Sequence, residues 1–304
     1  MTELRPTVRG RMRTKQAWAG FGFVAPALVF LAVAMVWPLA LSVQQAFFRT
    51  DLTTQQPIFV GLKNFVIFFT NNSLVGTLPT TLVFVVASTA VAFALGLLWA
   101  LILEQIRRGR AILRAATLIP WVLPSVVTAF LWAWIFNGQY GVLNGTANAL
   151  GWLHENVVWL ADPTGANIAI ILARTWQSLP WFVLMFLAGF QSVPTELVEA
   201  VRVDGGGNWL VFRHVILPHL RFTMIVAVIL GAMGNLQLFD LIYAMTGGGP
   251  GGATAVMSLQ VYQEAFQSFD LGTASAIGVI WILLLVIPTI IYVRGALPVA
   301  QKER

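Results

Sequence analysis

The chain has 304 residues and a net charge of +6; 58% of its residues are hydrophobic and only 10% are charged. Soluble domains carry about 25% charged residues, so this composition leaves too few charges to cover a water-exposed globule. Cysteine is absent, which excludes disulfide frameworks and thiolate metal sites. In a membrane protein, an excess of basic residues is explained first by the orientation of the loops and by contact with anionic lipid. Binding to nucleic acid is a less direct explanation. We predict an all-α membrane protein that contacts lipid and binds no nucleic acid or metal.

The N-terminal region joins a basic tail, residues 1–17, to a long apolar run. Secretory signal peptides have the same order, but their apolar region is only about 7–15 residues long. The run here extends from about residue 18 to 44. We therefore interpret it as a retained first span that follows a cytoplasmic tail.

Further apolar runs follow along the whole chain, and a bilayer core requires about 20 apolar residues per helix. The sequence predicts about six spans, at residues 18–44, 78–103, 111–136, 167–190, 215–239 and 272–294. We expect them to form a single transmembrane domain, residues 18–304, in a bacterial inner membrane.

Lysine and arginine predict the orientation of these spans, because cytoplasmic loops carry an excess of both. Fifteen of the 18 basic residues fall in the N-terminal tail, beside the loops after spans two and four, and at the C-terminal end. The opposite loops hold only Arg49 and Lys63, and Arg174 lies inside span four. Both termini are therefore predicted to be cytoplasmic.

A charged segment, residues 191–214, separates spans four and five. Pro194 can open a helix, because proline is tolerated in the first turn, and Asp204-Gly205 is a typical stop and turn. The pattern predicts a helix, a turn and a second helix on the cytoplasmic side. An ordinary connecting loop with an interfacial helix is the alternative.

Polar residues lie at membrane depth in spans four and five, where they are costly unless they face protein or a wet cavity. In span four they are spaced to share one helix face, and in span five a second face is expected. The two faces comprise Arg174, Gln177, Ser178, Trp181, Gly231, Asn235 and Leu238. They would suit a small solute rich in hydroxyl groups, although hydrogen bonding between helices is the alternative.

The segment Glu199-Ala200-Val201-Arg202-Val203-Asp204-Gly205-Gly206, with Phe212 and Ile216-Leu217-Pro218 after it, resembles the Glu-Ala-Ala loop of binding-protein-dependent ABC importer permeases. Val201 stands where that family usually has alanine, and Gly206 where alanine is common. The N-terminal span pattern resembles that of the first of the two unlike permeases that such systems usually encode. Further segments resemble the carbohydrate, maltose-type branch of the family. They are residues 59–65, 120–124, 132–134, 140–144, 239–240 and 246–250.

This resemblance implies that Glu199, Ala200, Asp204 and Gly205 couple the chain to an ATPase, and that the seven polar-face residues line the solute path. Only Asn235 keeps the residue type expected there, and Arg174 could suggest a phosphorylated or acidic solute. The implied partners are a second permease, two ATPase subunits and an extracytoplasmic solute-binding protein that delivers a sugar or polyol.

The chain itself has no G-x-x-x-x-G-K-[ST] phosphate-binding loop. We therefore expect a transport subunit that is not an enzyme and binds no cofactor, with ATP and Mg held by the ATPase chains. A secondary transporter or channel without an ATPase is the alternative. Few ionisable residues lie in the spans, however, which is unusual for a proton relay.

Overall fold

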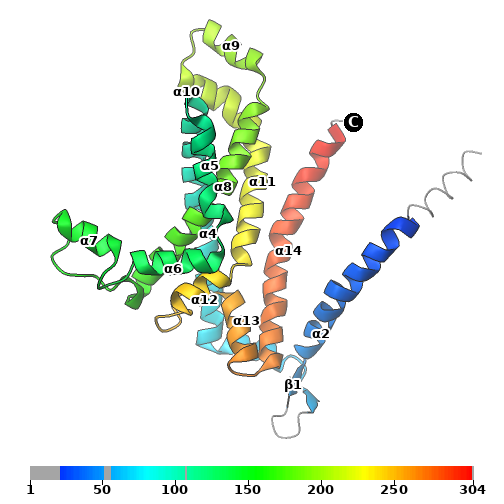
Figure 1. Ribbon diagram of the computed structural model, residues 1–304. Helices are drawn as coiled ribbons and strands as arrows, with labels where there is room; N and C mark the ends of the chain where they lie inside the picture. Colours follow the sequence, from blue (N-terminus) through cyan, green and yellow to red (C-terminus); the bar gives the residue numbers. More distant parts are fainter. Residues whose placement is uncertain (1–20, 51–55, 107, 303–304) are drawn as a thin grey trace, which may run out of the picture.

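The computed structural model describes residues 21–50, 56–106 and 108–302, and most of this chain is helical (Figure 1). The basic tail and Arg107 lie outside the described residues. Within these ranges, five helices are long and apolar enough to cross a membrane, and a bent pair makes a possible sixth span. The five are Phe21–Gln45, α4 (Asn72–Gln105), α8 (Pro163–Gln191), Asn208–Leu236 and the segment Leu271–Ile291 of α14 (Leu271–Lys302).

The expected third span is two helices, α5 (Arg110–Val122) and α6 (Ser125–Ile135), which meet at an angle of 96°. The break follows from Pro124, because a proline pushes the preceding residue out of the helical region. Leu123 accordingly has φ −70° and ψ 134°. The sequence analysis predicted one continuous span here and missed the bend.

Two long helices contain π turns, Ala32–Val36 and Phe212–Ile216. The first lies before α2 (Trp37–Gln45), and the second joins α10 (Asn208–Val211) to α11 (Leu217–Leu236). Each is followed two residues later by a proline, Pro38 or Pro218. Since proline has no N–H to donate to the carbonyl four residues back, the helix is locally rewound at these points.

The core of the bundle forms where α4 packs along α8. A Cβ atom added at Gly96 of α4 would lie 2.6 Å from Cβ of Phe182 on α8. Around this contact the rings of Phe93 and Phe186 meet edge to face, with centroids 5.2 Å apart. A residue without a side chain therefore allows the two backbones to approach closely.

We expect Gly96→Ala to destabilise the chain, although alanine favours helix over glycine by about 1 kcal/mol. The added methyl group would overpack the α4–α8 contact, which typically costs about 1–3 kcal/mol. Thermal unfolding of the detergent-purified protein would show a lower Tm. Gly76→Ala in the same helix is the control, because nothing lies within 4 Å of its added Cβ. A Tm for Gly96→Ala at or above the Gly76→Ala value would contradict the prediction.

The first long helix stands away from the bundle and meets α14 and a hairpin only near its C-terminal end (Figure 1). The hairpin pairs β1 (Phe48–Thr50) with β2 (Pro57–Phe59) and leads into α3 (Lys63–Thr70). Buried Asn64 donates hydrogen bonds of 2.9 Å to the carbonyls of Ala46 and Phe48. The segment 59–65 therefore fixes the end of the first span.

Short helices lie in the half of the bundle away from α9 (Thr195–Val203), and one of them extends to the side, as Figure 1 shows. They are α7 (Val142–Ala149), the 3₁₀ turn Trp159–Ala161, α12 (Asp240–Thr246) and α13 (Met257–Phe266). Asn144 is buried here; its amide donates to the carbonyls of Gly138 and Val157, and its oxygen accepts from Trp159 Nε1.

Candidate functional site

The helix α9 projects from the bundle at the far end from α12 and α13 (Figure 1). It lies between α8 and α10, as the sequence predicted, and none of its residues is buried. All four predicted coupling residues are exposed. Glu199 and Ala200 lie on α9, and Asp204 and Gly205 lie in the turn directly after it. The loop therefore offers a surface for contact with another chain.

The turn after α9 has the geometry of a Schellman motif. Gly205 N–H donates to the carbonyl of Arg202, and Gly206 N–H donates to that of Val201. Gly205 has φ +82°, a conformation that side chains disfavour. The Asp-Gly-Gly sequence is thus explained by the way in which the helix ends.

Val201 and Gly206, the two departures from the usual Glu-Ala-Ala pattern, touch each other. A Cβ atom at Gly206 would lie 2.5 Å from Val201 Cγ1 and 2.7 Å from the Val201 carbonyl oxygen. The side chain of Val201 occupies the space that a methyl group at position 206 would need. We infer that the two departures compensate for each other.

We expect Gly206→Ala to reduce uptake by the importer that the resemblance implies about 5- to 10-fold, because about 1 kcal/mol of overpacking displaces the end of α9. Adding Val201→Ala should recover part of the loss, since it removes the nearer contact. Initial uptake rates in membrane vesicles would measure both variants. Wild-type uptake by the single variant, or no recovery in the double variant, would contradict this prediction.

Exposed apolar side chains flank the coupling residues. Leu197 is 50% exposed, Val203 86% and Trp209 67%. Apolar groups gathered around a polar element on a surface are typical of protein–protein contact sites. This arrangement favours a docking surface over an ordinary connecting loop.

A polar network lies inside the bundle, about halfway along α4 and α8. Arg174 Nε donates to Asn235 Oδ1 at 2.6 Å, and Arg174 Nη1 donates to Gln177 Oε1 at 3.0 Å. The Asn235 amide in turn donates to Ser88 Oγ at 3.1 Å and Thr89 Oγ1 at 2.8 Å. The network therefore joins α4, α8 and the C-terminal end of α11.

The same network reaches the break between α5 and α6. Gln177 Nε2 donates to Ser125 Oγ at 3.2 Å and to the carbonyl of Leu123 at 3.4 Å. Sequence reasoning missed Ser88, Thr89 and Ser125. The adjacent hydroxyls of Ser88-Thr89 in an otherwise apolar run were the available signal, but their partners lie far away in the sequence.

Three of the seven predicted path residues, Arg174, Gln177 and Asn235, are brought together in this network. The Ser178 hydroxyl instead donates to the carbonyl of Arg174 in its own helix. Trp181 Nε1 donates to the carbonyl of Ala227 and ties α8 to α11.

The other two predicted path residues have packing roles. A Cβ atom at Gly231 would lie 2.6 Å from the ring of Phe182. Leu238 follows the end of α11 at Leu236 and is buried in the core. The expectation that it shares a helix face with Asn235 was wrong, because the helix stops two residues earlier.

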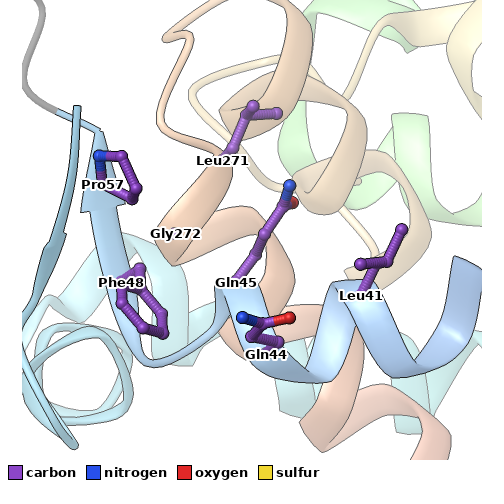
Figure 2. A pocket seen from close by; sticks show the side chains of 7 residues that line it. All are labelled: Leu41, Gln44, Gln45, Phe48, Pro57, Leu271 and Gly272. Carbon is purple, nitrogen blue, oxygen red and sulfur yellow. The ribbon is translucent and has the colours of Figure 1, made fainter. Parts of the chain in front are cut away.

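Two cavities lie at the end of the bundle that carries α12 and α13. One, of about 240 Å³, is bounded by α2, the hairpin and the start of α14; Figure 2 shows Gln45 pointing toward Leu271 across it. The other, of about 480 Å³, is lined by Asn72, Gln260 and Gln263 and by glycines of the 246–252 loop. Neither includes a network residue. Within the described ranges, no three His, Asp or Glu residues are placed to hold a metal ion.

The bundle, its broken span and the projecting helix define a membrane permease. Residues 92–294 match the family described as the binding-protein-dependent transport system inner membrane component, and the chain belongs to this family. It is therefore a multi-pass membrane protein and a transport subunit.

Two relatives cover most of the chain. The trehalose/maltose transport system permease protein MalF of Thermococcus litoralis is 34% identical over 93% of this chain and 95% of its own length. The sulfoquinovosyl glycerol transport system permease protein SmoG of Agrobacterium fabrum is 35% identical over 89% and 88%.

The fold also has a match among solved structures. A chain of a bacterial alginate ABC transporter, in complex with an alginate pentasaccharide-bound periplasmic protein, superposes with a TM-score of 0.78. The match covers 93% of this chain and 94% of the other, at 21% identity. It supports the arrangement of the helices.

Proposed function

We propose that this permease forms, with a second permease subunit, the translocation path for a sugar or related polyol in an ATP-driven importer. An external solute-binding protein would deliver the solute, and two ATPase subunits would hold ATP and Mg. The names of the relatives from T. litoralis and A. fabrum, which specify sugar-type solutes, support this class. The observation that carries the proposal is the polar network between α4, α8 and α11 in a chain of this family.

The covalent order of the helices provides a route from ATP to the network. The ATPase dimer would close on ATP and move α9, which connects directly to α8 on one side and to α10 and α11 on the other. Helix α8 carries Arg174, and helix α11 carries Asn235. A shift of α9 would thus alter the spacing of the groups proposed to hold the solute, and the bundle would open outward.

Co-purification tests this proposal without knowledge of the solute. The tagged chain would be expressed with candidate permease and ATPase subunits from the same organism, and an ATPase is expected to co-purify in a stable complex. Vesicles that contain the complex should take up solute only with ATP and the binding protein. If the chain alone supports uptake, it is instead the secondary transporter or channel that the sequence left as the alternative.

A further inference from the structure

The positive charge of Arg174 has no counter-ion among the described residues. Their one ion pair joins Glu104 to Arg110, at the junction of α4 and α5. The groups that accept from Arg174, on Asn235 and Gln177, are neutral amide oxygens. The network thus carries a net charge of +1.

One edge of the guanidinium is free to bind something else. Within the described part of the chain, Nη2 has no hydrogen-bond partner, yet it is not among the fully buried unpartnered atoms. It lies beside exposed Gly234 of α11, where an added Cβ would be 3.7 Å away. The absence of a side chain at Gly234 leaves this edge open.

The position of Arg174 makes an uncompensated charge costly. It lies well inside the 29-residue helix α8, and its partner Asn235 contacts the middle of the 34-residue helix α4. Ionisable groups at such depth pair with one another or face a water-filled cavity. The C-terminal end of α11 offers only about half a negative charge, and amide oxygens offer none.

The network also holds the guanidinium rigidly. Asn235 is fixed by Ser88 and Thr89, and Gln177 is fixed by Ser125. These bonds orient the neutral acceptors on Nε and Nη1 and leave Nη2 as the available donor. A pre-oriented guanidinium edge is well suited to carboxylate, phosphate and sulfonate oxygens.

We infer that Arg174 binds an anionic group of the transported solute, so that the cargo is an acidic sugar or polyol. This inference rests on the proposed function and narrows its substrate class. The competing explanation is a carboxylate of the second permease that pairs with Arg174 in the assembled importer.

The first test determines the charge of the cargo. The partner solute-binding protein would be purified from cells, and the solute that it releases on heating would be identified by mass spectrometry. We expect a carboxylate, phosphate or sulfonate on a sugar or polyol. A neutral sugar would overturn the inference, while ATP- and binding-protein-dependent uptake of that sugar would leave the proposed function intact.

The second test uses the same released solute with the complete importer in vesicles. Arg174→Gln should raise KM for uptake about 10- to 100-fold. The reason is that loss of a hydrogen bond to a charged group weakens ligand binding by about this factor. Arg174→Lys should recover part of the loss. Arg221→Gln, an equal charge change at an exposed site on α11, is the control.

Size-exclusion chromatography of the complex distinguishes solute binding by Arg174 from pairing of Arg174 with the second permease. If Arg174 pairs with the second permease, Arg174→Gln should dissociate the complex, and that result would overturn the inference. An intact complex with raised KM supports it. An intact complex with wild-type KM overturns it as well.

Discussion

Glu199→Lys is expected to lower uptake about 100-fold or more, while the chain still inserts and folds. Glu199 is exposed on α9 and makes no hydrogen bond or ion pair within the described residues, so its replacement costs the isolated fold little. At the proposed ATPase interface, where we expect Glu199 to contact a basic residue, charge reversal would place like charges together, which costs several kcal/mol. Loss of docking would uncouple ATP hydrolysis from movement of α8 and α11.

Uptake into vesicles and ATP hydrolysis stimulated by the binding protein would measure this effect. Glu155→Lys is a matched control, because Glu155 is also exposed but lies between α7 and the 3₁₀ turn, at the other end of the bundle. Normal uptake and normal stimulation by Glu199→Lys would exclude Glu199 as a coupling residue.

Asn235→Leu is expected to reduce uptake about 10- to 100-fold without dissociating the complex. Leucine cannot accept from Arg174 Nε or donate to Ser88 and Thr89, so it leaves a charged donor unsatisfied at membrane depth. Such a loss costs about 1–3 kcal/mol, and more for a charged group. The guanidinium would also lose the contact that orients it.

Transport kinetics and the elution volume of the complex would be measured together for Asn235→Leu. Asn148→Leu is the control, since Asn148 is exposed on α7 and, among the residues that the structure describes, its side-chain amide bonds only to Asn156. Unchanged kinetics for Asn235→Leu would show that the network has no part in transport.

The coupling helix was predictable because its signals are local. Pro194 at its start and Asp204-Gly205 at its end mark boundaries that depend on backbone chemistry within a few residues. The structure confirms a helix between these marks, and it explains Gly206 through its contact with Val201. That the loop contacts an ATPase through Glu199 stays a prediction, as does the cytoplasmic position of the termini.

The polar network was only half predictable. Helical spacing placed Arg174 and Gln177 on one face, and the structure confirms that they touch. The bond from Asn235 to Thr89 joins residues 146 positions apart. No local pattern specifies such a pair, because it depends on which faces of α4, α8 and α11 pack together.

By itself, the sequence determined the membrane class, the approximate spans and the helix between spans four and five, because hydropathy and helix capping act over short stretches. Pro124 breaks the helix through local backbone chemistry. Only the tertiary structure decided the angle of 96° between α5 and α6, the end of α11 before Leu238 and the separation of network residues from packing residues. These features depend on contacts between distant segments. Close packing at Gly96 and Gly231 positions those segments, and packing is a property of the assembled bundle.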